Sequence, residues 1–257
     1  MAPATAQKTM VGDTRMNPDR RSAVLAGVLF IVGTVAGTAS LGLFTDPILS
    51  SPDYLTGVSE GESKVLVGAL LELVMGVSLA GMALAVYPVL KKFSARAAVG
   101  YFGARLVEAV MYVISVVGLL VLLTLSQEFV GAGAPDASWF QTSGELLLAV
   151  RDWSGHVVLD VAVFPLGAAI FYVVLYRSRL VPRWLSGWGL IGAALYWAAG
   201  LFVMFDLVTP LDTIHIALQA PLGVQEMVLA VWLIVKGFNP SVIAAASASS
   251  GAPQGRT

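Results

Sequence analysis

Three titratable side chains, Asp152, His156 and Asp160, recur at intervals of four residues in the segment LLLAVRDWSGHVVLDVAVF, residues 146–164. On a helix this spacing places all three on one face. Imidazole and carboxylate groups can bind a metal ion, but this stripe would need further ligands from other helices. Haem ligation by His156 together with His215 is geometrically conceivable, but two histidines are no signature of such a site. We therefore predict no metal site and no cofactor.

Five charged residues interrupt long apolar runs and are candidates for a polar site within a membrane. They are Glu72, Arg105, Glu108, Asp160 and Glu226. Charged groups at membrane depth are costly, usually face the interior of a helix bundle, and often mark function. Arg105 and Glu108 are three residues apart, so they share a helix face and can pair. The other three carboxylates have no basic partner within the apolar runs.

The excess of acids over bases in these runs has a chemical consequence. Four carboxylates and one guanidinium cannot all stay ionised in a dry interior, so some carboxylates are protonated, bind a cation or are reached by water. Alternatively, these residues only join helix to helix by hydrogen bonds. Arg151, Asp152 and His156 are expected at or above the outer interface, either as a solvated helix start or as a mouth that leads to Asp160. No residue is assigned a catalytic role.

The elements that must position these residues are transmembrane helices. The chain of 257 residues is 57% hydrophobic and 12% charged, whereas a soluble domain carries about 25% charged residues. A bilayer span needs about 20 mostly apolar residues, and the sequence contains six such runs. They cover residues 22–44, 65–90, 99–125, 156–176, 187–208 and 214–235. We predict an all-α membrane bundle of six transmembrane helices over residues 20–238.

The basic residues predict the orientation of these helices. Twelve of the fifteen Lys and Arg residues lie in the two tails or in loops on the same side as the tails. Because cytoplasmic segments carry the excess of Lys and Arg, both termini are predicted to be cytoplasmic, in a multi-pass protein of the cell inner (plasma) membrane. Residues 1–19 and 239–257 are rich in Ala, Ser, Gly and Pro, and we predict that both tails are disordered.

The charge balance and the absence of familiar motifs limit the partners. A net charge of −1 creates no field that would attract nucleic acid. The sequence contains no Walker loop, no HExxH and no GxSxG motif. The expected partners are membrane lipid, a small or lipophilic ligand and, as an open option, a second copy of the chain.

Five blocks of the sequence together carry a resemblance to a known family. They are LFIVGTVAGTASL (29–41), ALLELVMGVSLAGMALAVYPVLKK (69–92), GYFGARLVEAV (100–110), LYRSRLVPRWLSGWGLIGAAL (175–195) and PLGVQEMVLAVWLIVKGF (221–238). On these blocks the chain resembles the domain-of-unknown-function 4386 family of bacterial integral membrane proteins. The resemblance implies an all-helical membrane protein and supplies no activity and no catalytic residue.

Three functions are compatible with these patterns. The first is binding or proton-linked transport of a small ligand through a buried carboxylate and arginine site. The second is a membrane-embedded enzyme that acts on a lipophilic substrate, isoprenoid or quinone-like, by acid–base chemistry. The third is a structural or regulatory membrane partner without catalysis. A cavity that opens on both sides in alternate states would favour the first, a pocket that opens sideways to lipid with an acid at its end the second, and no cavity the third.

Overall fold

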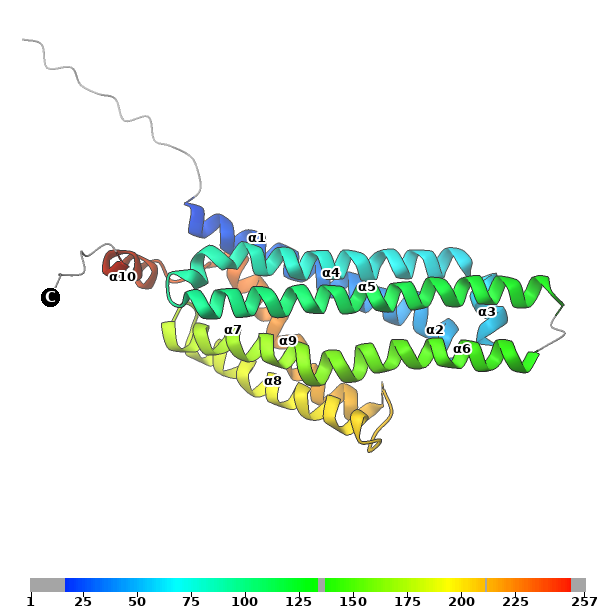
Figure 1. The fold of residues 1–257 in the computed structure, drawn as a ribbon. Coiled ribbons are helices and arrows are strands. Elements are labelled where there is room, and N and C mark those ends of the chain that lie inside the picture. Colours follow the sequence, from blue (N-terminus) through cyan, green and yellow to red (C-terminus); the bar gives the residue numbers. More distant parts are fainter. Residues whose placement is uncertain (1–16, 134–136, 211, 251–257) are drawn as a thin grey trace, which may run out of the picture.

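The computed structural model describes residues 17–133, 137–210 and 212–250, and all regular structure in these ranges is helical (Figure 1). Six stretches are long and apolar enough to cross a membrane, which confirms the predicted fold class. They are Pro18–Leu49, Glu62–Lys91, Ala95–Gly131, Ser138–Ser178, Arg183–Met204 and Thr213–Val235. The individual elements are α1 (Pro18–Ala39), η1 (Ser40–Thr45), α2 (Asp46–Leu49), α3 (Tyr54–Glu60), α4 (Glu62–Lys91), α5 (Ala95–Gly131), α6 (Ala137–Asp152), η2 (Trp153–Val163), α7 (Phe164–Ser178), α8 (Arg183–Met204), α9 (Thr213–Val235) and α10 (Pro240–Ser250).

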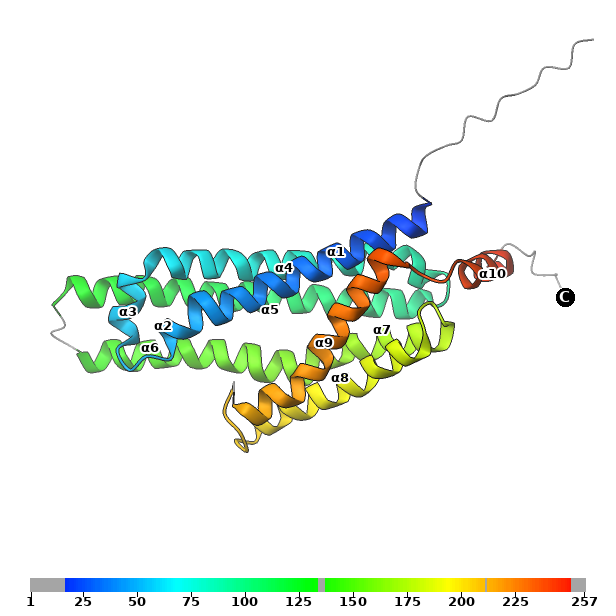
Figure 2. The ribbon, with the colours of Figure 1, turned by 180° about the vertical axis from the view of Figure 1, so that it is seen from behind.

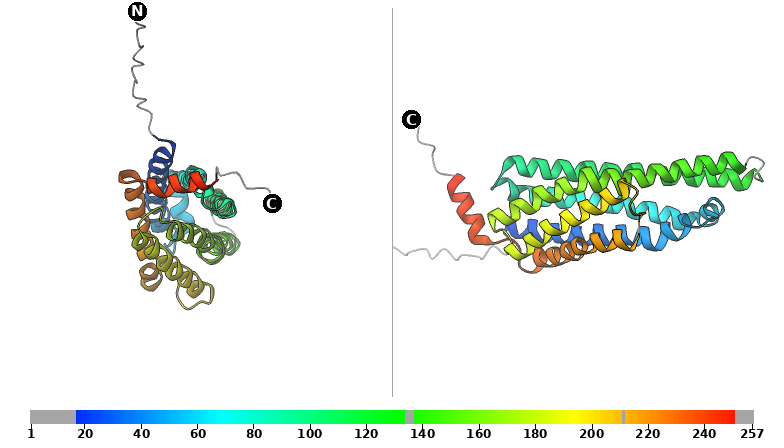
Figure 3. Two further views of the ribbon diagram at one scale, coloured as in Figure 1. Left: turned by 90° about the vertical axis from the view of Figure 1, so that its left-hand side faces the viewer. Right: turned by 90° about the horizontal axis from the view of Figure 1, so that it is seen from below.

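The first and last described helices lie at the same end of the bundle. The start of α1 and the whole of α10 are found at one end, which we call the termini end, and α10 lies across it (Figure 3). The elements α2 and α3, the end of α5 and the start of α6 lie at the opposite end, which we call the loop end (Figure 2). An even number of spans produces this arrangement.

The assignment of the termini end to the cytoplasm is a prediction that reporter fusions can test. An enzyme that is active only outside the cytoplasm should give no signal at the C-terminus and a strong signal when inserted after Gly133, because Gly133 follows α5 at the loop end. A fluorescent protein that matures only in the cytoplasm should give the reverse pattern and serves as the control. Activity outside the cytoplasm at the C-terminal fusion alone would contradict the predicted orientation.

The segment after residue 239 differs from the predicted disorder. It forms α10, with Pro240 at its start and Asn239 before it, whose Oδ1 accepts a hydrogen bond from the Ser241 N–H at 3.2 Å. The sequence VIAAASAS is low in complexity, but alanine is the best helix former, and an Asn cap followed by Pro is a favourable helix start. The side chain of Ile243 is buried in the main core. Residues 1–16 and 251–257 of the predicted tails lie outside the described residues.

A π-helical segment interrupts the fourth span. The helix is continuous from α6 through η2 to α7, and η2 covers eleven residues. Pro165 follows shortly after η2 and has no N–H to donate, so the regular hydrogen-bond ladder cannot be completed there. π-Helical turns inside α-helices are frequent at functional sites, and η2 contains both His156 and Asp160.

The bundle has two halves, a termini half and a loop half, named for the nearer end. The termini half is tightly packed. Its largest fully buried side chains include Tyr101, Phe171 and Met82, and the rings of Tyr101 and Phe171 stack with centroids 4.6 Å apart. Helices α1 and α9 approach closely here, since a Cβ on Gly27 would lie 2.5 Å from the carbonyl oxygen of Ala230. The bundle is therefore closed by packed side chains between the termini end and the charged residues in its middle.

Candidate functional site

All eight candidate residues from the sequence line one cavity of about 890 Å³. The cavity extends from the middle of the bundle to the loop end, and its wall is formed by residues of α1, η1, α2, α4, α5, α6, η2, α7, α8 and α9. The candidate residues are Glu72, Arg105, Glu108, Arg151, Asp152, His156, Asp160 and Glu226. The residues predicted as an intramembrane site and those predicted as a mouth therefore belong to one continuous space.

Arg105 and Glu108 form the ion pair that their spacing on one helix predicts. Arg105 Nη1 donates to both carboxylate oxygens of Glu108, at 3.0 and 2.8 Å, and both side chains are buried. Arg105 Nε also donates to the Tyr101 hydroxyl at 3.2 Å. The guanidinium lies over the rings of Phe164 and Phe30, at 5.3 and 6.0 Å from their centroids, so its position is fixed by aromatic contacts as well as by charge.

Glu226, on α9, lies near the same arginine. Its Oε1 lies 4.0 Å from Arg105 Nη2, which is close enough for attraction and too far for a hydrogen bond. This oxygen is buried and has no hydrogen-bond partner among the described residues. The expectation that Glu226 lacks a nearby base is thus corrected, because α5 and α9 bring Arg105 to it. Buried polar atoms are nearly always hydrogen-bonded, so Glu226 Oε1 is an acceptor that lacks a donor among the described residues, in a side chain that lines the cavity.

Glu72 also has a basic partner, contrary to the expectation from the sequence. Arg151 Nη2 donates to Glu72 Oε1, and Arg151 Nη1 donates to Glu72 Oε2 at 3.3 Å and to the Ser115 hydroxyl at 2.8 Å. The long side chain of Arg151 extends from α6 between α4 and α5, so it ends deeper in the bundle than its backbone position indicated. The pair joins residues that are 79 positions apart in the chain.

Asp160 is the centre of a third polar group. Its Oδ1 accepts a hydrogen bond from the Tyr196 hydroxyl at 3.0 Å, and its Oδ2 accepts one from Gln219 Nε2, also at 3.0 Å. Asp160 Oδ2 lies 3.8 Å from Nε2 of His215, and both residues are buried. The close packing of η2 on α8 depends on Gly200, where a Cβ would lie 2.8 Å from that of Asp160.

The mouth residues have different surroundings from one another. Asp152 is exposed, whereas His156 is partly buried and its ring meets the ring of His215 edge to face, with centroids 5.7 Å apart. Asp152 is thus the more accessible of the two to solvent, whereas a ring nitrogen of His156 lies within 4.8 Å of a carboxylate oxygen of Asp160. Asp152 directly precedes η2, and His156 lies near the start of η2.

Sequence reasoning missed several uncharged members of this wall. Tyr196 and Gln219 bind Asp160, and Ser115 binds Arg151. A search for charges in apolar runs cannot detect them, because serine and tyrosine are common in membrane helices. Gln219 offered a usable signal, since a primary amide in an apolar helix also requires hydrogen-bond partners.

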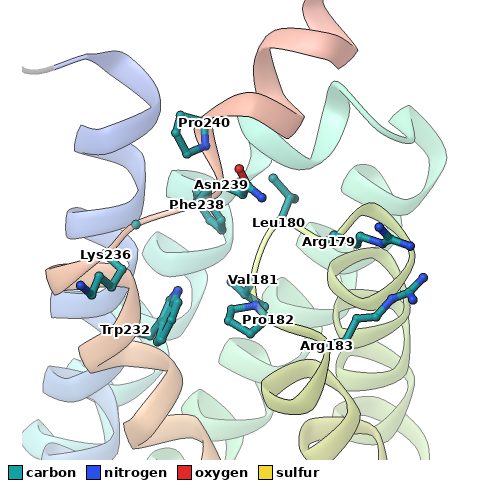
Figure 4. Close-up of a pocket in the computed structure, with 11 residues that line it drawn as sticks. Arg179, Leu180, Val181, Pro182, Arg183, Trp232, Lys236, Phe238, Asn239 and Pro240 are labelled. Atoms are coloured by element: carbon teal, nitrogen blue, oxygen red, sulfur yellow. The ribbon is translucent and has the colours of Figure 1, made fainter.

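A second cavity, of about 580 Å³, lies at the termini end and contains none of the candidate residues. It carries three basic side chains, those of Arg179, Arg183 and Lys236. Figure 4 shows the two arginines on one side of this cavity and Lys236 on the other. Their charges do not converge on one point, so the polar cavity of the loop half is the better candidate for a specific site.

Comparison with known proteins gives a family and no activity. No curated protein and no solved structure matches the chain. The family described as "Domain of unknown function (DUF4386)" matches residues 25–237. This match covers all six membrane-spanning helices apart from the first residues of α1, and the chain is therefore a member of the DUF4386 family.

Proposed function

We propose that the protein binds a small amphiphilic cation in the cavity of the loop half. The observation that carries this proposal is that Glu226 lines the cavity and that its buried Oε1 has no hydrogen-bond partner among the described residues. A positively charged or N–H-donating group of a ligand would complete its interactions.

The charges of the wall support a cationic ligand. Six carboxylates line the cavity against two arginines: Asp46, Glu72, Glu108, Asp152, Asp160 and Glu226 against Arg105 and Arg151. Each arginine already has an acidic partner in Glu108 or Glu72. Unpaired carboxylates in a medium of low dielectric constant are costly, so a cation that enters this space is favoured over an anion.

The shape of the cavity supports an amphiphile. Thr38 on α1 and Ile216 and Ala220 on α9 line the cavity and are also exposed on the outside of the bundle. The cavity thus reaches the surface between α1 and α9, which separate toward the loop end (Figure 2). In a bilayer this surface faces lipid, so an apolar tail can extend through the opening while the charged group lies at Glu226.

Transport would require a second state. The packed side chains of Tyr101, Phe171 and Met82 close the bundle on the termini side of the cavity. Proton-linked transport therefore depends on separation of these residues, and binding alone does not.

The sideways opening also favours a second candidate, a membrane-embedded enzyme for a lipophilic substrate. In this alternative Glu226 acts as the general acid at the end of the pocket, and Arg105 stabilises negative charge beside it. Conversion of an isoprenoid or quinone-like compound by the purified protein would favour this candidate over simple binding.

A binding experiment with a fluorescent lipophilic cation tests the main proposal. Rhodamine 6G should bind to the purified full chain in nanodiscs, and a neutral or anionic dye of similar size should bind at least tenfold more weakly. Glu226→Gln keeps the shape of the side chain and removes its charge, so it should weaken rhodamine 6G binding at least tenfold, about 1.4 kcal/mol. Glu62→Gln is the matched control, because Glu62 is exposed on α4 outside the cavity.

Two results would overturn the proposal. One is equal affinity of the wild type for the cationic and anionic dyes. The other is unchanged rhodamine 6G affinity in a Glu226→Gln variant with a normal melting temperature. The melting temperature is needed because a change in folding alone would also reduce binding.

A further inference from the structure

Two histidines and one aspartate converge at the loop half of the cavity. His156 and Asp160 come from η2, and His215 comes from the first turn of α9. One possible ligand atom from each of the three lies within 4.8 Å of the other two. We propose that His156, Asp160 and His215 bind a divalent transition-metal ion such as Zn²⁺ or Fe²⁺. The proposed amphiphile is not needed for this site.

The fold supplies the ligand that the sequence stripe lacked. Residues four apart remain on one face in η2, so His156 and Asp160 point to the same side of the fourth span. Helix α9 then adds His215, which is 59 residues from His156 in the sequence. Asp152, the third member of the stripe, is exposed and is not part of the triad. The sequence spacing alone predicted no metal site, because it does not show which helices lie beside η2.

The surroundings of Asp160 resemble the support that metal ligands receive. Tyr196 and Gln219 donate hydrogen bonds to its two oxygens, and such partners orient ligating carboxylates. Gln219 Nε2 also lies 3.1 Å from His215 Nε2, so one amide nitrogen lies against both Asp160 and His215. A cation at this point would interact with both groups.

The ligand types indicate the class of ion. Two imidazoles and one carboxylate are a set used for zinc and for non-haem iron, whereas Mg²⁺ and Ca²⁺ prefer oxygen ligands. With bonds of about 2.1 Å, ligand atoms around tetrahedral zinc lie about 3.4 Å apart. His215 Nε2 and Asp160 Oδ2 are 3.8 Å apart, and the His156 ligand atom lies within 4.8 Å of both residues' ligand atoms, so side-chain rotations must bring the three atoms closer by up to about 1.4 Å. His156 and Asp160 line the cavity, which gives the ion an entry path and leaves an open coordination position toward it.

The composition of the chain permits a clean test. The sequence contains no cysteine and two histidines, both in the triad. The full chain should be purified with an affinity tag that contains no histidine, treated with a chelator and titrated with Co²⁺. We expect one equivalent of Co²⁺ per chain, with a visible absorption band of nitrogen and oxygen coordination, and displacement by Zn²⁺. Mg²⁺ should neither bind measurably nor displace Co²⁺.

Variants connect the metal to these residues. His156→Gln and Asp160→Asn should each weaken Co²⁺ binding at least tenfold, and Tyr196→Phe should weaken it less at unchanged stoichiometry. Asp53→Asn is the matched control, because Asp53 is an exposed carboxylate at the same end of the bundle. His215 is fully buried, and its replacement could prevent folding. The test therefore uses His156→Gln, because His156 is only partly buried.

The possible outcomes separate this inference from the proposed function. Wild-type protein that binds no Co²⁺ or Zn²⁺, or a His156→Gln variant that binds as tightly as the wild type, overturns the metal site. Neither result changes the expected binding of rhodamine 6G, which depends on Glu226. A Co²⁺ band that is lost in His156→Gln and retained in Asp53→Asn supports the site.

Discussion

Replacing Arg105 with leucine is expected to lower the free energy of unfolding by about 3–5 kcal/mol, the range for breaking a buried ion pair by removing one partner. Arg105 and Glu108 are 3% and 2% exposed, and Arg105 Nη2 is also 4.0 Å from Glu226. The substitution leaves the buried carboxylate of Glu108 and the partly buried carboxylate of Glu226 without their cation. It also removes the guanidinium from the rings of Phe30 and Phe164. Reversible unfolding in mixed micelles at neutral pH measures the loss.

A double-mutant cycle shows whether the pairing is the cause. Glu108→Leu combined with Arg105→Leu should recover much of the lost stability, because both charges are then removed. Recovery should remain incomplete, since Glu226 keeps its charge, and adding Glu226→Gln should recover more. Arg96→Leu is the matched control, because Arg96 is exposed in the first turn of the same helix. An Arg105→Leu variant that is as stable as Arg96→Leu would refute the pairing.

The bundle was predictable because its determinants are local. A run of about 20 apolar residues forms a helix across a bilayer whatever its neighbours are, since every backbone group must find a partner within the helix. The six runs in the sequence correspond to the six spans of the structure. The Arg105–Glu108 pair was predictable for the same reason, because its two members lie one turn apart on one helix.

The remaining pairs could not be predicted because they join different helices. Arg151 meets Glu72 across 79 positions, and Glu226 on α9 approaches Arg105 on α5, which no periodicity encodes. Charge counting within spans also assigned Arg151 to the interface from its backbone position alone. A flexible side chain as long as arginine changes the depth of its charge by more than one helical turn.

The function of the cavity depends on the same distinction. The sequence identified which residues are costly to bury, and all eight candidates line the same space. It could not indicate that His215 approaches Asp160, or that Glu226 Oε1 has no hydrogen-bond partner among the described residues. These two features, which carry the metal and ligand proposals, result from the packing of α9 against its neighbours.

The second large effect is expected at the link between α4 and α6. Arg151→Leu should lower the free energy of unfolding by about 3 kcal/mol, because it leaves Glu72 buried without a cation and removes a donor from Ser115. Glu72→Leu alone should cost less, since Arg151 is more exposed than Glu72 and can turn toward the loop end. Reversible unfolding in mixed micelles measures both.

The asymmetry between these two variants tests where the charges lie. If Glu72 is the deeper partner, the double variant Glu72→Leu with Arg151→Leu should be more stable than Arg151→Leu alone, with a coupling energy of about 1–3 kcal/mol. Lys64→Leu, at an exposed position of α4, controls for the loss of a positive charge near the loop end. Equal losses in the two single variants that simply add in the double variant would mean that the residues do not interact, and that apolar contacts alone hold α6 against α5.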